Sequence, residues 1–265
     1  MNAPAIAARL PAAASWVVFY LAILVAWVGL AWMAGDGAIA PLAAWSDVDA
    51  DSFLARCLAS AAALDLDHLV IMWALMSLGM MLPTTFPTLQ RLAELLLGRP
   101  LAIRRFLMFC AAYLLVWLGF SVVAAIAQSF LAGLGLMDET GRTQSGLVAA
   151  LLFGFAGAYQ FSRLKHACLS RCRHPMTFFL AQWREGSAGA FVMGLRHGRD
   201  CLGCCWALML LAFVGGTMNL AWMGLAMILM LIEKLAGPGR YVTAPLGVVL
   251  ILAAGFSFGA ALQTI

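Results

Sequence analysis

The densest group of candidate metal ligands is a cysteine block in the second half of the chain, where five of the seven cysteines lie within 38 residues. His197, Cys201, Cys204 and Cys205 fall within an arc of roughly 100° if this segment is a helix with 100° per residue. Two further cysteines, four residues apart, precede them and could complete the shell. Thiolate is the preferred ligand of Cu(I) and Zn(II), and imidazole suits both ions. The spacing therefore predicts one soft-metal site built from six side chains: His197, Cys201, Cys204, Cys205, Cys168 and Cys172.

A methionine-rich helix face offers a second set of soft ligands. His68, Met72, Met76 and Met80 are each four residues apart, so on a helix they drift by only about 120° in total over ~18 Å. Thioether selects Cu(I) and is a poor zinc ligand, although methionine more commonly fills gaps in packing. We therefore expect Cu(I) as the metal, with zinc as the alternative. The residues of the expected relay are His68, Met72, Met76 and Met80, with Met218 and Met223 approaching from across a bend.

Composition decides which elements must carry these ligands. Of the 265 residues, 64% are hydrophobic and 11% are charged, and the mean hydropathy is +0.95. A soluble domain is closer to half apolar and a quarter charged, so a water-soluble fold is excluded. A disordered chain and a nucleic-acid binder with a basic face are excluded as well. The apolar segments are about twenty residues long, which indicates transmembrane helices rather than barrel strands.

The expected fold is an all-α, polytopic transmembrane helix bundle that forms one integral membrane domain over residues 1–265. About seven spans are predicted, with six as the alternative. The clearer ones cover approximately 16–33, 66–82, 106–130, 147–161 and 242–262, and the second should end at Pro83 and Pro87. The 32 residues 201–232 contain no charge but are too few for two crossings, so span five is expected to begin upstream, near Ser187. A cleaved signal peptide ending near Ala38–Ala40 is the alternative for span one, but its apolar stretch is longer than is typical of a signal.

The basic residues predict the orientation. Fourteen of the sixteen Lys and Arg residues fall on one side of the predicted spans, and only Arg56 and Arg142 fall on the other. By the positive-inside rule the basic side is cytoplasmic, which places the N-terminus in the cytoplasm and the C-terminus in the periplasm. Eight acidic residues fall outside: Asp36, Asp47, Asp49, Asp51, Asp65, Asp67, Asp138 and Glu139. The predicted location is the bacterial cell inner membrane, as a multi-pass protein.

The chain also resembles a known family. The stretch from Trp183 through His197-Gly198 to Cys201-Leu202-Gly203-Cys204-Cys205-Trp206 is similar to the signature of a bacterial domain-of-unknown-function family. Other matching landmarks are Trp73, Met76, Met80–Pro83, Tyr159-Gln160, Lys165, Cys168, Cys172, Met218–Leu220, Trp222-Met223 and Glu233-Lys234. That family is described as predicted metal-binding integral membrane proteins, and some members are called copper chaperones. The resemblance covers about residues 66–234 and implies metal handling.

The leading hypothesis is an inner-membrane protein that binds Cu(I) through the Cys/His cluster and the methionine face. It would deliver the ion to a recipient metalloprotein or across the membrane, with metal ion and membrane lipid as partners and no nucleic acid. One alternative is a thiol–disulfide oxidoreductase using Cys201 and Cys204, which form a Cys-x-x-Cys pair. It ranks lower because the pair is expected at the reducing, cytoplasmic end. A copper or iron membrane oxygenase would want more than four histidines, and a purely structural subunit is the remaining possibility. A chaperone or transporter is favoured over an enzyme.

Overall fold

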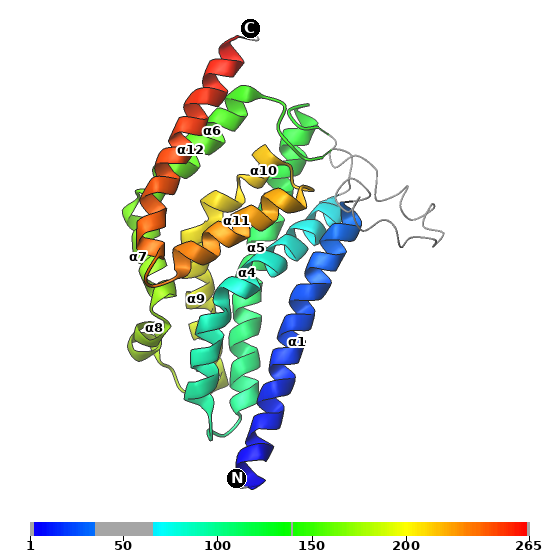
Figure 1. Ribbon diagram of the computed structural model, residues 1–265. Coiled ribbons are helices and arrows are strands. Elements are labelled where there is room, and N and C mark those ends of the chain that lie inside the picture. The colour runs from blue at the N-terminus through cyan, green and yellow to red at the C-terminus, as the bar shows by residue number, and fades with distance from the viewer. Residues whose placement is uncertain (1–2, 35–65, 139, 264–265) are drawn as a thin grey trace, which may run out of the picture.

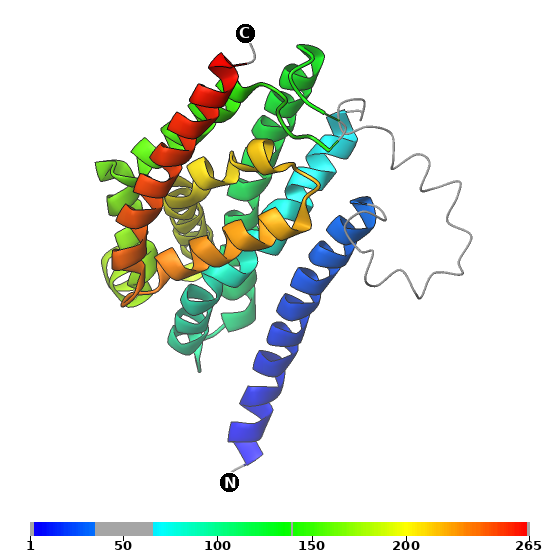
Figure 2. The same ribbon diagram turned by 45° about the horizontal axis from the view of Figure 1, so that its top comes forward.

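The computed structural model describes residues 3–34, 66–138 and 140–263, which form a bundle of α-helices (Figures 1 and 2). The helices are α1 (Ala3–Met33), α4 (Leu66–Leu96), α5 (Ala102–Gly133), α6 (Gly146–Gln160), α7 (Arg163–Arg173), α8 (Pro175–Gln182), α9 (Gly186–Met209), α10 (Ala212–Gly215), α11 (Leu220–Lys234) and α12 (Gly239–Leu262). In this part of the chain, the only β-type pairing is an isolated bridge between Met137 and Thr143. The predicted all-α class is confirmed.

Several of these helices could cross a membrane. Among the described residues, four stretches are long and apolar enough: α4, α5, α9 together with α10, and α12. The helices α6 and α7 form a bent pair, with 63° between them, and the apolar part of α1 is the shorter stretch Phe19–Met33. With 15 residues, α11 covers about 22 Å, which is less than the ~30 Å hydrocarbon core. The predicted sixth span is therefore not a full crossing by length alone.

The bundle has three parts (Figures 1 and 2). On one side, α1 packs against α4. On the opposite side, α6 and α12 lie side by side and make the most extensive helix pairing of the structure. Between these two sides, α5 packs against both α4 and α9, and α11 runs obliquely across the middle. The central helices therefore carry the core, and the outer pair leaves most of its side chains outside it.

The second predicted span was given the wrong end. Pro83 and Pro87 lie inside α4, which continues to Leu96 and changes direction near its middle (Figure 1). A proline has no N–H for the carbonyl four residues earlier, so Pro83 leaves the Gly79 oxygen without its helical donor. The indole Nε1 of Trp27, on α1, donates to that oxygen at 3.1 Å. The tertiary contact satisfies the freed carbonyl and allows the helix to continue through the proline.

The start of span five and the break near Gly216 agree with what the sequence predicts. The helix α9 begins at Gly186, one residue from the predicted Ser187. The chain reverses after α10 at Gly216, whose positive φ of 94° favours glycine. Asn219 then caps α11, its side chain accepting from the Trp222 N–H at 3.0 Å. This reversal brings the end of α11 back beside the middle of α9.

The close contact of α5 and α9 depends on glycines, Gly194 above all; a Cβ at Gly198 would also come within 2.9 Å of Val116 on α5. A Cβ atom at Gly194 would collide with the backbone oxygen of Phe109 on α5. Small residues that allow such backbone approach are typical of helix pairs in membranes. The contact fixes the rotation of α9 and so determines which of its side chains face α5.

Several sequence predictions concern residues outside the described ones. The candidate cleavage motif Ala38–Ala40, Arg56 and six of the eight acidic residues assigned to the outer side lie there: Asp36, Asp47, Asp49, Asp51, Asp65 and Glu139.

Candidate metal centre

The predicted ligand face of α9 points into the bundle. His197, Cys201, Cys204 and Cys205 are all at most 2% exposed. The neighbouring helix α7, which packs against α9, contributes Cys172 at 8% exposure. The 100° spacing argument correctly predicted that these α9 residues share a buried side. The cysteine pair on the neighbouring segment was expected to complete the shell, and one member of that pair, Cys172, has its sulfur 4.0 Å from that of Cys204.

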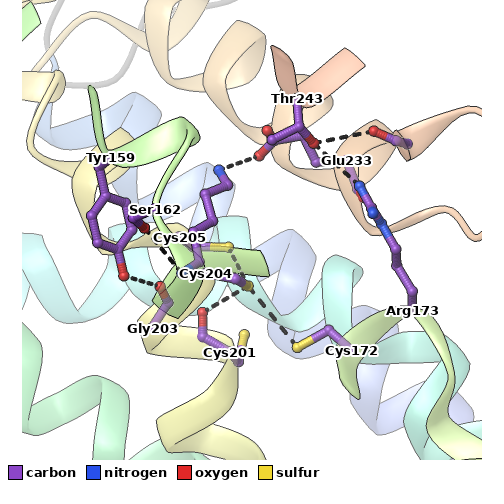
Figure 3. A network of polar contacts seen from close by, with 12 residues as sticks. Tyr159, Ser162, Cys172, Arg173, Cys201, Gly203, Cys204, Cys205, Glu233 and Thr243 are labelled. Atoms are coloured by element: carbon purple, nitrogen blue, oxygen red, sulfur yellow. Dashed lines mark hydrogen bonds and ion pairs between the residues drawn. The ribbon is translucent and has the colours of Figure 1, made fainter. Parts of the chain in front are cut away.

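Four sulfur atoms gather between α7 and α9 (Figure 3). The Sγ atoms of Cys204 and Cys205 are 3.3 Å apart, and those of Cys204 and Cys172 are 4.0 Å apart. Cys201 belongs to the same buried cluster, and its backbone oxygen accepts from the Cys204 thiol at 3.1 Å. Two sulfurs that share one ion, each with a bond of about 2.3 Å, are at most ~4.6 Å apart. Both measured distances are within that limit, so small movements would let a pair of these sulfurs bind one ion.

Among the described residues, no three His, Cys, Asp or Glu side chains are already arranged to hold a metal ion. The six-residue site therefore stays a prediction. Cysteines in this part of the chain are free thiols, which leaves their sulfurs available as ligands. Cu(I) needs only two or three of them, whereas a structural zinc site takes four ligands.

Two predicted ligands lie at the edge of the sulfur group. The His197 Nε2 atom is 3.0 Å from the Thr85 hydroxyl, and the ring stacks on Phe109 and Tyr113. Its Nδ1 atom is buried without a hydrogen-bond partner. Cys168 lies at 7% exposure against the backbone of α9, where a Cβ on Gly203 would come within 2.7 Å of its sulfur. Neither side chain makes a hydrogen bond to another cysteine.

Polar residues from two other helices contact Cys201. The Tyr113 hydroxyl on α5 is 3.2 Å from the Cys201 sulfur, and Lys234 Nζ at the end of α11 donates to it at 3.1 Å. Lys234 also donates to the Thr84 hydroxyl on α4 at 2.7 Å. Tyr113, Thr84 and Lys234 were not among the residues predicted for the site. The signal for Lys234 was its position beside Glu233 at the end of an apolar stretch, but it was interpreted as a loop charge.

That interpretation was wrong for two lysines. Lys165 is 1% exposed and pairs at 2.8 Å with Glu233, itself 1% exposed, and Lys234 is 8% exposed. Figure 3 shows the surroundings of this ion pair: Arg173 on α7 donates to the Glu233 backbone oxygen at 2.7 Å and to the Thr243 hydroxyl at 3.2 Å. These lysines belong to a buried polar network beside the cysteines. They therefore do not count as loop charges in the orientation argument.

The methionine face is buried in the same core as the cysteines. Met72, Met76 and Met80 are at most 2% exposed and share one cluster with Cys201, Cys204 and Cys205. Met223 belongs to this cluster, and Met218 is partly buried against it. At the start of α4, His68 is exposed, with its Nδ1 3.4 Å from an oxygen of Asp67. The predicted face therefore begins at the surface and enters the interior.

A further methionine connects this face with the cysteine group. Met81 is 1% exposed, and its backbone oxygen accepts from the Tyr113 hydroxyl at 3.1 Å, the same hydroxyl that contacts Cys201. The Thr84 hydroxyl, which Lys234 contacts, is 3.9 Å from the Met81 sulfur. Met81 was not among the predicted relay residues, because it follows Met80 directly and so does not fit the four-residue spacing.

A family model described as a copper chaperone (PpoB2) matches residues 70–257. The chain belongs to this copper chaperone family. The match contains α5, α6, α7, α9 and α11, all six predicted Cys/His ligands and most of α4, and it continues into α12. Comparisons with curated proteins and with solved structures found no match. The copper-handling role expected from the sequence resemblance is therefore supported at the level of the family.

Proposed function

We propose that this copper chaperone is a multi-pass inner-membrane protein that binds Cu(I) in its cysteine cluster and passes it to a recipient metalloprotein. The observation that carries the proposal is the close grouping of Cys172, Cys201, Cys204 and Cys205 in one buried core, with Sγ distances of 3.3 and 4.0 Å for two of the pairs. A buried group of soft sulfur ligands favours Cu(I) over hard cations. Cys168 and His197 are the outer members of the proposed ligand set.

In the proposed route, Cu(I) first meets Asp67 and His68 at the exposed start of α4. The buried thioethers of Met72, Met76 and Met80 then hold it weakly, because a neutral thioether carries no charge to retain the cation. Each step brings the ion closer to thiolates, which bind it more tightly, so the ligand order gives the transfer a direction. For every thiol that becomes a ligand, one proton must leave its sulfur.

The exit is proposed at α7. Cys168 and Cys172, at 7% and 8% exposure, are the least buried of the five cysteines in the block. A recipient that approaches α7 would therefore meet them first. Transfer between thiolates requires no redox change, because Cu(I) stays Cu(I) as one sulfur ligand replaces another.

The proposed orientation places the start of α1 in the cytoplasm and the end of α12 in the periplasm. In the structure these helix ends lie at opposite ends of the bundle (Figure 1). Without the two buried lysines, twelve basic residues remain on the proposed inner side against two on the other. Reporter fusions should place the turn between α4 and α5 inside and the C-terminus outside. A cytoplasmic C-terminus would contradict the orientation.

The metal site is tested with Cys201→Ser and Cys204→Ser combined. Copper measured in protein purified under reducing conditions should be lost, while the variant still inserts and stays monodisperse in detergent. Cys110→Ser is the matched control, since Cys110 is a free, partly buried thiol on α5; it should retain copper. Wild-type copper content in the double variant would refute the proposed site.

Thiol–disulfide exchange is the second candidate, because Cys201 and Cys204 are neighbours on α9. The expected position at the cytoplasmic end no longer argues against it, because Cys201 lies about 22 Å into α9 and is fully buried. Burial is the stronger argument against it, because Cys201 and Cys204 are at most 1% exposed and an exchanging thiol must be attacked by another thiol. An oxidised Cys201–Cys204 pair in protein isolated with rapid alkylation would favour the enzyme.

A further inference from the structure

Lys234 is a buried cation without a carboxylate partner. Its Nζ atom has two hydrogen-bond acceptors, the Thr84 hydroxyl at 2.7 Å and the Cys201 sulfur at 3.1 Å. Across the described residues, no Asp or Glu lies within ion-pair distance of it. The other buried lysine of the network, Lys165, pairs with Glu233 at 2.8 Å. The two lysines therefore differ in what balances their charge.

A buried ammonium is costly unless an opposite charge lies next to it. The carboxylate of Glu233 is occupied by Lys165. The group beside Lys234 that can carry negative charge is the sulfur cluster, which begins at Cys201. The lysine thus places one positive charge against the cluster, whatever ion the cluster holds.

This charge treats monovalent and divalent ions differently. Cu(I) held by two thiolates forms a unit with a net charge of minus one, and the ammonium brings the buried centre to zero. A divalent ion held by the same two thiolates is already neutral, so the ammonium remains unbalanced. Such an ion reaches balance only with a third thiolate, which requires one more buried thiol of the cluster to lose its proton.

We propose that Lys234 is a specificity-determining residue of the cysteine centre: its ammonium balances a bis-thiolate Cu(I) unit and disfavours divalent ions. The proposal rests on the proposed function, since it takes the cluster to be the copper site. It assigns α11 a role in metal selectivity, although α11 contributes no sulfur ligand to the cluster.

The test compares the Cu(I)-to-Zn(II) affinity ratio of purified full-length variants, measured with competing chromophoric chelators for each ion. Lys234→Met keeps the length and removes the charge. It should lower the ratio at least about tenfold, because unit charges a few ångströms apart interact strongly even at an effective dielectric constant of about 20. Lys234→Gln is a second neutral variant that keeps a donor for Thr84. Lys234→Arg keeps the charge and should stay within a few-fold of wild type.

The matched control combines Lys165→Met with Glu233→Gln. It removes a buried ion pair from the same network but leaves the charge beside Cys201 in place, so its ratio should equal that of wild type. An unchanged ratio in a folded Lys234→Met or Lys234→Gln variant would overturn the inference, and so would a low ratio in folded Lys234→Arg. If wild-type protein itself binds no cysteine-dependent Cu(I), the proposed function fails instead.

Discussion

The helices α4 and α12 have similar hydropathy but are buried to very different extents. Their mean hydropathies over the most apolar 18 residues are 1.7 and 2.1, yet 61% of that stretch is buried in α4 and 11% in α12. On α12, Phe256 is 82% exposed, as expected for a side chain that faces lipid. On α4, Met72 and Met76 are completely buried.

This difference in burial distinguishes two roles that an apolar helix can have. A helix that faces lipid needs only apolar side chains, because lipid tails are as apolar as leucine. A helix buried on most sides can carry sulfur and hydroxyl groups, since neighbouring helices supply their partners. In this protein most sulfur and hydroxyl groups of the candidate site accordingly lie on α4 and α9, and the buried share is 61% for α4 and for α9 with α10. Cys168 and Cys172 on α7 and Tyr113 on α5 add to them.

The largest effect is expected from one methyl group in the buried region. Gly194→Ala should separate α5 from α9, because its Cβ would meet the Phe109 backbone oxygen, which no change of rotamer can relieve. We expect a loss of at least about 3 kcal/mol, or no folded protein. Gly255→Ala on α12 is the matched control, since nothing lies within 4 Å of its Cβ. Thermal unfolding in detergent compares the two, and equal stabilities would contradict the packing contrast.

The next effect is on transport rather than stability. Combining Met72→Leu, Met76→Leu and Met80→Leu keeps side-chain volume, at a cost of less than ~1.5 kcal/mol each. Cellular copper delivery should nevertheless fall several-fold, because leucine offers no thioether, while the purified protein still fills its cysteine site. Met193→Leu is the control, because Met193 is 1% exposed but belongs to the other core cluster. Unchanged delivery in the triple variant would make the methionine face ordinary packing.

A moderate effect is expected where α1 meets α4. Trp27→Phe removes the donor to the Gly79 oxygen and should cost about 1 kcal/mol, since it leaves that carbonyl without a partner. In a Pro83→Ala background the same substitution should cost less, because residue 83 then supplies an amide N–H to the Gly79 oxygen. A double-mutant cycle of unfolding free energies measures this coupling. Additive costs would show that the indole does not replace the missing helical donor.

The smallest effect is expected at the exposed Glu185. Hydrogen bonds from the Trp183 indole and then from the Arg99 guanidinium lower the pKa of the Glu185 carboxyl. A carboxyl whose pKa is lower in the folded state stabilises the fold at neutral pH, and this contribution is lost as the pH falls through that pKa. Glu185→Gln should therefore cause only a slight loss of stability at pH 7, and this loss should vanish as the pH is lowered from 7 to below the pKa of the carboxyl. A loss that stays constant across this pH range would contradict the charge mechanism.

Hydropathy correctly predicted where most helices lie, because a lipid-facing span such as α12 needs only a long apolar stretch. It gave α4 the wrong end, because the Gly79 carbonyl is satisfied by Trp27, 52 residues earlier in the chain. A local rule about proline cannot include a partner so far away.

Prediction of the candidate site from the sequence was limited in the same way, because some of its residues are far apart in the chain. Helical spacing correctly placed His197 and the α9 cysteines on one buried side, since they share one helix. It missed Tyr113 and Lys234, which are 88 and 33 residues from Cys201 in sequence. Lys234 was also missed because a lysine after an apolar stretch usually lies at the membrane surface. Only the reversal at Gly216 brings it back beside α9.

The burial of Glu233 and Lys234 at the end of α11 has a consequence for biosynthesis. Their side-chain partners Lys165, Thr84 and Cys201 all precede them in the sequence. A ribosome makes the chain from its N-terminus, so these partners have already been synthesised when α11 emerges. The two charged side chains can then pair as soon as α11 docks. If α11 preceded these helices in the sequence, its two charged side chains would be synthesised before their partners.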